Sequence, residues 1–419
     1  MVNPYSVIRG VFVSLPVMDE EFLSNPYPAF AGLRAQGPVH RMLLPSGLRV
    51  WAVVSHEEAR IAMTHPALSK DIDTSVELGY FDREMSEGGT PRLEHSSVGR
   101  HMLNMDPPGH TRLRKLVNKA LTARSVERLR PTIERISAEL LDSVEKAAAD
   151  SGDGVVDLVE HYTAVFPVKV LGELLGITAE HLPVLVGLTG AIMSNDNENA
   201  GANMARFGQH IGQMIQHKRA EPGDDLISAL VTARDDQDQL SDVELVSTVF
   251  LLVVAGYETT VNMIGHGVRA LLGHPEQLAA VRADPGLIPA ANEEFLRYEG
   301  PGNRATLRYA TEPLELGGVA VGAGEYVSVL LGSANRDEAK FACPHVLDVS
   351  RSTNGHLGFG HGIHYCVGAP LARAEMEIAL RDILARFPDL SLAVPDSELR
   401  WRKSFMMQGL ETLPVRLRP

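Results

Sequence analysis

The sequence predicts a mostly helical protein with a minor β component. From Gly109 to about Ala270, apolar residues recur at the three- and four-residue spacing of amphipathic helices. This pattern is interrupted near Asp150–Gly154, Gly176 and Pro222–Gly223, where small and polar residues indicate turns. Short strand-like runs stand outside the helical region, at Val50–Val54 before it and at Val319–Val321 and Tyr326–Leu331 after it.

No internal repeat, low-complexity tract or linker divides the 419 residues. This length exceeds the usual size of a single hydrophobic core, although a large cofactor can provide the centre around which one domain grows. We therefore expect one domain over residues 1–419.

The first 100 residues predict a short helix near Pro28–Ala35, the strand at 50–54 and a long polar segment over residues 71–100. That segment is rich in Gly, Ser and Glu and has no periodicity. It is expected to be a long loop, and such loops in compact domains are usually functional or mobile.

A long buried helix is predicted to begin after Ser241. Ser241-Asp242-Val243-Glu244 has the form of a capping box, and the helix extends to about Leu272. Residues 249–255 are apolar on nearly every face, which is typical of a helix inside the core. A further helix is predicted from about Ala369 to Arg386, followed by strands at Leu390–Val394 and at the end of the chain.

Composition excludes several classes of function. With 39 basic and 53 acidic residues the net charge is −14, which disfavours binding to a phosphate backbone. Met1–Val17 lacks a basic start followed by an apolar stretch, and the apolar run Val249–Ala255 is far shorter than the about 18 residues of a spanning helix. We expect a cytoplasmic protein that binds neither nucleic acid nor membrane. A structural disulfide between its two cysteines, Cys343 and Cys366, is disfavoured in that compartment.

The segment from Phe359 to Gly368 is the most informative in the chain. Gly360 and Gly362 permit a tight turn, and Cys366 stands just before a predicted helix, where free amides and the helix dipole favour an anionic sulfur. A buried free cysteine is the common alternative for a single thiol. A zinc site would require more ligands than Cys366, His361 and His364.

The string Phe359-Gly-His-Gly-Ile-His-Tyr-Cys366-Val-Gly368 resembles the haem-binding signature of the cytochrome P450 superfamily at every fixed position. The resemblance extends from about Asn25 to the C-terminus and is greatest to soluble actinobacterial members. It implies the P450 fold, with haem b between the long central helix and the helix that follows Cys366, and with Cys366 as the thiolate ligand of the iron.

The resemblance also assigns residues to the rest of the haem site. His110 and Arg114 share one helix face, and with Arg308 they are expected to bind the haem propionates. Further haem contacts are expected from Phe359, His364, Gly368, Ala255 and Gly256.

Ala255-Gly256-Tyr257-Glu258-Thr259-Thr260 lies within the predicted central helix. A carboxylate in a buried helix is costly, and Thr259 beside it can hydrogen-bond back to a carbonyl and loosen the helix. Gly256 leaves room beside the chain, so together these residues predict a small polar groove able to hold oxygen and water. The pair resembles the acid–alcohol pair of the family, in which Thr259 would stabilise the activated oxygen and Glu258 would relay protons for O–O cleavage.

Glu294 and Arg297 resemble the Glu-x-x-Arg pair of the family, which is structural: three residues apart, they share a helix face. In many relatives another arginine completes a triad, but Val346 occupies that position here. We expect His345 or a backbone carbonyl to replace it.

The family resemblance implies a monooxygenase that uses O2 and two electrons from NAD(P)H, delivered by a ferredoxin and a ferredoxin reductase, to hydroxylate or epoxidise a bulky small molecule. A macrolide, a polyketide or a steroid-like secondary metabolite would suit the long 71–100 segment and a mobile helical lid around 180–215. The residues expected to line the substrate pocket are Val253, Ala255, Asn303, Arg304, Met406 and Met407.

Two other classes of function stay open at this point: a peroxide-driven haem-thiolate or oxidative coupling enzyme, and a haem-binding sensor without turnover. Glu258–Thr259 favours the monooxygenase, because a peroxide user does not require proton delivery through that pair. Arg112, Lys115 and Lys119 form a basic stripe that either steers an acidic electron donor or is an ordinary solvated helix face.

Overall fold

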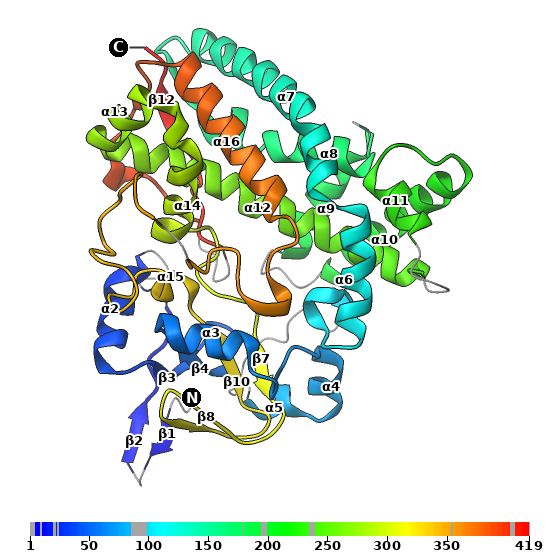
Figure 1. Ribbon diagram of the computed structural model, residues 1–419, viewed down its shortest axis with the longest axis vertical. Coiled ribbons are helices and arrows are strands. Elements are labelled where there is room, and N and C mark those ends of the chain that lie inside the picture. Colours follow the sequence, from blue (N-terminus) through cyan, green and yellow to red (C-terminus); the bar gives the residue numbers. More distant parts are fainter. Residues whose placement is uncertain are drawn as a thin grey trace.

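The structure is a computed structural model in which the described residues are all but 1–4, 9–10, 20–21, 23–24, 85–98, 179, 194–198, 234–238, 353–354, 403–406 and 419. Helices fill most of the upper part, most of the labelled strands gather at the lower end with α2 and α3, and β12 lies at the top near the C-terminus (Figure 1). The helices are α2 (Pro26–Gln36), α3 (His56–Thr64), α4 (Ile72–Glu77), α5 (Tyr80–Glu84), α6 (Gly109–Ala120), α7 (Ala123–Asp150), α8 (Phe166–Leu175), α9 (Leu182–Met193), α10 (Ala200–Ala220), α11 (Leu226–Thr232), α12 (Asp242–Gly273), α13 (Pro275–Ala283), α14 (Ile288–Glu299), α15 (Leu331–Ala334) and α16 (Ala369–Arg386). A fold that is mostly helical with a minor β component is confirmed.

The strands form small sheets. The largest has the order β3-β4-β10-β7-β5, in which β10 runs parallel to β4 and every other neighbouring pair is antiparallel. A second sheet has the order β11-β12-β6, and β1-β2 and β8-β9 are hairpins. The strands are β1 (Tyr5–Ile8), β2 (Val11–Ser14), β3 (Val39–Leu43), β4 (Arg49–Val53), β5 (Leu68–Ser69), β6 (Val155–Asp157), β7 (Arg308–Ala310), β8 (Leu314–Leu316), β9 (Val319–Val321), β10 (Tyr326–Val329), β11 (Ser391–Leu392) and β12 (Pro414–Arg416).

The central helix α12 begins as its sequence predicts. The Ser241 hydroxyl accepts a hydrogen bond from the Glu244 amide, and the Glu244 carboxylate accepts one from the Ser241 amide at 2.8 Å, so the capping box is confirmed. α12 contacts α16, α14, α8 and α10. By length and composition α12 is also the one helix in the described part of the chain that could cross a membrane, but these contacts place it in the protein core.

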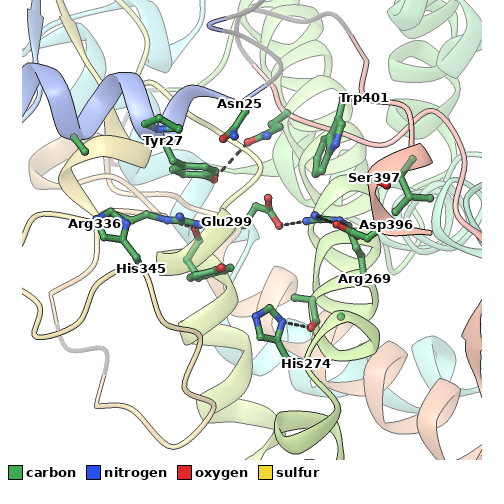
Figure 2. Close-up of a pocket in the computed structure, with 17 residues that line it drawn as sticks. Asn25, Tyr27, Arg269, His274, Glu299, Arg336, His345, Asp396, Ser397 and Trp401 are labelled. Carbon is green, nitrogen blue, oxygen red and sulfur yellow. Dashed lines mark hydrogen bonds and ion pairs between the residues drawn. The ribbon is translucent and has the colours of Figure 1, made fainter. Parts of the chain in front are cut away.

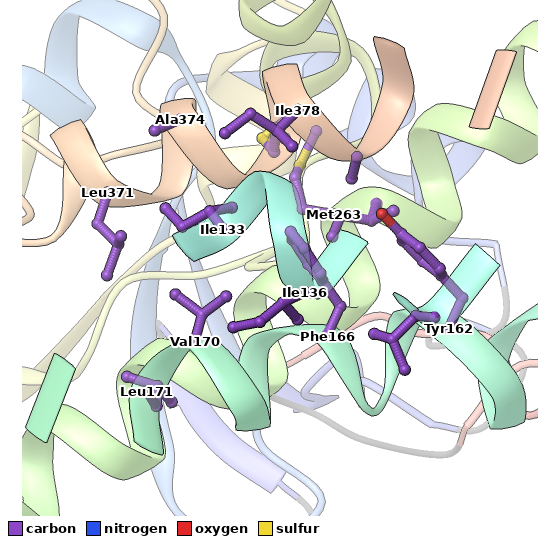
Figure 3. Close-up of a cluster of buried hydrophobic side chains, with 14 of the residues drawn as sticks. Ile133, Ile136, Tyr162, Phe166, Val170, Leu171, Met263, Leu371, Ala374 and Ile378 are labelled. Atoms are coloured by element: carbon purple, nitrogen blue, oxygen red, sulfur yellow. The ribbon is translucent and has the colours of Figure 1, made fainter. Parts of the chain in front are cut away.

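The hydrophobic core joins α12 to α7, α8 and α16 (Figure 3). Side chains from all four helices interdigitate there, and most are almost fully buried. The cluster includes Ile133, Ile136, Phe166, Val170, Leu171, Met263, Leu371, Ala374 and Ile378. This packing fixes α16, and with it the loop that carries Cys366, against α12.

Two sequence-based predictions of secondary structure were wrong in part. Residues 71–100 are not one continuous loop, because α4 and α5 occupy its first half. The Asp71 side chain caps α4 by accepting the Thr74 amide at 3.2 Å, a signal present in the sequence. Residues 85–98 of that segment lie outside the described residues. The strand predicted at 390–394 is limited to β11.

Candidate functional site

The loop that carries Cys366 is a tight turn held by its backbone. The Cys366 amide donates to the Phe359 carbonyl at 2.9 Å, which closes the turn. Gly360 and Gly362 have φ of 76° and 74°, in the left-handed region that favours glycine. A Cβ at Gly362 would also lie 2.8 Å from Thr64 Cγ2 of α3, so the loop requires glycine there for space as well.

The Cys366 thiol stands at the N-terminus of α16, as predicted, and is solvent-accessible. The protein packed around it raises the pKa of the thiol, whereas the Gly368 and Ala369 amides and the positive charge of Arg114 lower it. These amides stabilise a thiolate, but the raised pKa means that a further positive charge, such as an iron ion, is needed to keep the sulfur ionised near neutral pH.

The ring of Phe359 lies beside this loop. Its centroid is 6.2 Å from that of Tyr365, and the guanidinium of Arg373 lies 4.6 Å above the ring. Arg373 is in turn held by Glu293, at 2.6 Å between Nε and Oε1. The Phe359 ring is therefore fixed next to the turn that carries Cys366. This position agrees with the predicted role of Phe359 in shielding the sulfur.

Basic side chains converge near the Cys366 loop from several elements. The rings of His110 (α6) and His364 lie 4.5 Å apart, and burial with the positive charges of Lys70, His110, Arg308 and Arg114 lowers the pKa of His364 to about 2. Burial also lowers the pKa of Arg308 to about 10, whereas the negative charge of the Asp106 carboxylate raises it. The predicted propionate ligands are thus brought together.

This basic cluster (Lys70, His110, Arg114, Arg308 and His364) is an anion-binding site in chemical terms. Neither ring nitrogen of the buried His110 has a close hydrogen-bond partner among the described residues. The nearby carboxylate, Asp106, is occupied by the Ser69 hydroxyl and the Lys70 amide. Buried cations that outnumber the adjacent carboxylates require anionic partners, and the two propionates of a haem would supply them.

Replacing Arg308 with leucine is expected to weaken haem binding by about 10- to 100-fold, because a charge-assisted hydrogen bond contributes about 1.5–3 kcal/mol. The measurement is the rate of haem transfer from the variant to apomyoglobin. Arg282→Leu, on α13 and away from the cluster, serves as the control. Equal haem retention in the two variants would contradict the assignment.

The middle of α12 carries an accessible patch on an otherwise buried helix. Ala255 is exposed, although Leu251–Val253 just before it and Thr260–Val268 just after it are buried. Thr259, one turn after Ala255, donates its hydroxyl to the Ala255 carbonyl. Both predicted residues therefore share one accessible face of the core helix.

Glu258 is half-buried beside Thr259. Burial raises the pKa of its carboxyl group, and the positive charge of Arg402 lowers it. Tyr257 lies in the same surroundings, and burial raises the pKa of its hydroxyl. A carboxyl group whose pKa is raised holds a proton more readily than a free one, as a group that transfers protons requires.

Two predicted residues on α12 have packing roles. A Cβ at Gly256 would lie 3.0 Å from Leu171 Cδ2, so α8 fills the space that the sequence was expected to leave as a polar groove. Val253 is 3% exposed and belongs to the hydrophobic core, so it does not line an accessible pocket.

The other predicted pocket residues lie where the chain crosses from α14 to β7. Asn303 Nδ2 donates to Gln408 Oε1 at 3.0 Å, and Gly302 pairs with Met407 as an isolated bridge. Arg304 is buried. Met406 lies outside the described residues.

The Glu294–Arg297 pair is fully buried and bidentate, at 2.7 and 2.8 Å. Arg297 also donates to the Pro344 and Val346 carbonyls, but these carbonyls contact Arg297 and do not take the place of the missing arginine beside Glu294. The alternative of His345 was wrong, because His345 pairs with Glu338.

The missing arginine is replaced by Arg351, whose Nε lies 3.2 Å from Glu294 Oε1. Sequence reasoning missed this residue, which stands five positions after Val346. The sequence carries only a weak signal for Arg351, because only the folding of the loop brings this residue back to α14.

Two further buried groups were also missed. Lys70, 4% exposed, contributes to the basic cluster. Glu375 of α16 is buried against Thr260 of α12, and burial raises its pKa to about 8. No local sequence pattern marks Lys70 or Glu375 as part of a site, because the residues that they contact are far away in sequence.

The basic stripe predicted on α6 is interrupted. Arg112 pairs with Glu244 at the start of α12, so its charge is neutralised inside the fold. Within the described ranges, no group of three or more His, Cys, Asp or Glu side chains is arranged to hold a metal ion.

Comparison with known proteins agrees with this geometry. The chain matches the family described as Cytochrome P450 over residues 182–285 and 286–409. It is 44% identical to cytochrome P450 107B1 of Saccharopolyspora erythraea, over 97% of this chain and 98% of that protein. It is 42% identical to the 6-deoxyerythronolide B hydroxylase of the same organism, over 95% of this chain and 97% of the relative.

Among solved structures, the tirandamycin C-bound P450 monooxygenase TamI is similar, with a TM-score of 0.85 and 42% identity over 96% of this chain and 100% of that one. The chain belongs to the cytochrome P450 family. It is a monooxygenase that uses haem and O2 with electrons from redox partners.

Proposed function

We propose that this P450 hydroxylates or epoxidises a bulky secondary metabolite of the macrolide, polyketide or steroid-like kind. The observation that carries the proposal is the accessible Ala255–Thr259 face in the middle of the buried helix α12. α16, which follows the cysteine loop, packs against α12. The relatives support the substrate class: one is named as a hydroxylase of 6-deoxyerythronolide B, and another binds tirandamycin C.

Haem held through the Cys366 thiolate supplies the chemistry of oxygen activation. The chain 1–419 acts as one domain around it. The Gly368 and Ala369 amides would stabilise the negative sulfur, and Phe359 would shield it once the haem covers the accessible thiol. Ala255 would contact the haem from α12, whereas Gly256 packs against Leu171 of α8.

Binding of the haem carboxylates falls to the basic cluster. His110, Arg114, Arg308 and His364 orient the two propionates, and Lys70 adds a positive charge.

Thr259 and Glu258 carry the proton chemistry. The Thr259 hydroxyl, which donates to the Ala255 carbonyl, would orient and hand on the protons that oxygen activation consumes. Glu258, whose pKa burial raises, would supply protons by way of this hydroxyl.

The substrate lies against Ala255, Asn303, Arg304, Met406 and Met407. A ferredoxin and a ferredoxin reductase provide the two electrons from NAD(P)H in the cytoplasm. The redox partner approaches the side of the Cys366 loop, where the large side chains of Tyr365 and Ile363 are exposed.

Replacing Thr259 with alanine is expected to reduce product formation about 100-fold and to raise the release of hydrogen peroxide. The reason is that electrons and O2 still arrive while protons are misdirected. Product and peroxide are measured per NAD(P)H consumed, with 6-deoxyerythronolide B as probe and Thr163→Ala, a buried threonine in another element, as control. Unchanged peroxide release in Thr259→Ala would contradict the role of this hydroxyl.

A further inference from the structure

Glu293 lies at the centre of a polar array that it forms with His356 and Arg373 beside the cysteine turn. It stands on α14 directly before Glu294, but its carboxylate pairs with Arg373 near the start of α16. Two hydrogen bonds join the charged groups, at 2.6 Å from Arg373 Nε and 2.9 Å from Nη2. Burial raises the pKa of Glu293, but hydrogen bonds from Arg373 and His356 lower it to about 2, so the carboxylate is ionised. The negative charge of Glu293 therefore offsets the positive charge of Arg373.

His356 connects Glu293 to the backbone of the turn. Its Nε2 lies 2.9 Å from Glu293 Oε2, and its Nδ1 lies 3.0 Å from the Gly358 amide nitrogen. An ionised carboxylate only accepts and an amide N–H only donates, so Nε2 carries the proton and Nδ1 accepts. A Cβ at Gly358 would lie 3.1 Å from Leu296 Cβ, so the turn lies close against α14 at this point. Glu293 thus holds the residue that precedes Phe359 by way of one imidazole ring.

The Phe359 ring is enclosed by members of this array and by Tyr365. Its centroid lies 6.2 Å from that of His356 and 6.2 Å from that of Tyr365. The Arg373 guanidinium lies 4.6 Å from the same centroid, over the face of the ring, and donates to the Tyr365 hydroxyl at 3.4 Å. Because the Phe359 carbonyl accepts the Cys366 amide, a displacement of Phe359 would also displace the residue that carries the sulfur.

The charge of Arg373 also acts on the sulfur. Burial raises the pKa of the Cys366 thiol, and the positive charge of Arg373 is one of the influences that lower it. A cation near a thiolate-bound iron stabilises the reduced state, which carries one more negative charge than the oxidised state. The size of this effect depends on Glu293, because the carboxylate that holds Arg373 in place also neutralises it.

We propose that Glu293 is a positioning residue that sets the reduction potential of the haem iron through Arg373 and Phe359. Its charge offsets that of Arg373, and its contacts with His356 and Arg373 fix the Phe359 ring. The inference rests on the proposed ligation of the iron by Cys366.

The test is an equilibrium reduction of the haem-loaded protein with redox dyes, in which one electron from the reduced dye converts ferric into ferrous iron. Redox partner and substrate are left out, so their binding cannot contribute. Glu293→Gln keeps the size of the side chain and removes its charge. We expect the equilibrium to shift about 3- to 10-fold toward the reduced state, or about 30–60 mV for one electron, because Arg373 is no longer neutralised.

Glu299→Gln is the matched control on the same helix. Glu299 lies 2.7 Å from Arg269, at the polar cavity shown in Figure 2. Arg269 also pairs with Asp396 at 2.7 Å, so it keeps a carboxylate partner when Glu299 loses its charge. We expect the equilibrium to shift by less than about 2-fold. A shift as large as that of Glu293→Gln would overturn the proposal.

Changes at Arg373 test the inference with the opposite sign. Arg373→Leu removes the cation and leaves the charge of Glu293, so the equilibrium should shift about 3- to 10-fold toward the oxidised state. Arg373→Lys restores the positive charge and should recover most of that shift, which a mere loss of packing would not allow. An unchanged potential in Glu293→Gln, or shifts of the same sign in Glu293→Gln and Arg373→Leu, would contradict the proposal.

The absorption of the reduced, carbon-monoxide-treated protein separates this inference from the proposed function. If the wild type shows the red-shifted Soret band of thiolate ligation and Glu293→Gln keeps the potential of the wild type, the inference alone fails. If the wild type lacks that band, the assignment of Cys366 as the iron ligand fails, and the inference fails with it.

Discussion

Arg297→Met is expected to destabilise the protein by about 3–5 kcal/mol, because removing one partner of a buried ion pair leaves the other charge uncompensated. Glu294 and Arg297 are both 0% exposed, and Arg297 also donates to the Asn335, Pro344 and Val346 carbonyls. The variant would therefore lose the connection between α14 and the loop before the cysteine turn. The free energy of unfolding is measured by urea denaturation of the haem-loaded protein.

Two controls separate burial from charge. Arg351→Met is expected to cost less than Arg297→Met, because Arg351 is partly exposed and Glu294 keeps its bidentate partner. Arg381→Met removes an exposed pair with Glu134 and should change stability by at most about 1 kcal/mol. An Arg297→Met protein as stable as Arg381→Met would contradict this account of the triad.

Cys366→Ser is expected to abolish oxygenation to background while leaving the fold intact. Serine has nearly the volume of cysteine but does not ionise near neutral pH, so the amides of Gly368 and Ala369 would face a neutral hydroxyl. The basic cluster is separate from the sulfur and should still hold part of the haem. Turnover is measured with electrons from a ferredoxin and its reductase.

Cys343→Ser is the matched control for this prediction. Cys343 is the other free cysteine, exposed and with a positive φ of 48° in the loop whose carbonyl Arg351 contacts. Its replacement should leave turnover within about 2-fold of the wild type, since exposed positions away from the site contribute little. Loss of activity in both variants would point to a general role of the thiols rather than to ligation.

The sequence predicted well what is decided locally. The capping box at Ser241 fixes the start of α12 within one turn of the chain, and the glycines around Cys366 fix the cysteine turn because only they adopt its backbone angles. Family resemblance then placed His110, Arg114 and Arg308 at one site, and the structure brings them together.

What the sequence did not predict depends on contacts between distant segments. Arg351 completes the buried triad only because the loop after Pro344 folds back onto α14, and Lys70 joins the basic cluster only through the end of β5. Gly256 was expected to open a groove, yet the packing of α8 fills that space.

The ligation of iron by Cys366 is tested most directly by the absorption spectrum of the reduced, carbon-monoxide-treated protein. Thiolate ligation predicts the strongly red-shifted Soret band in the wild type and in Cys343→Ser, and its disappearance in Cys366→Ser. A wild-type spectrum without that band, or a Cys366→Ser protein that keeps it, would contradict the assignment of the sulfur as the iron ligand.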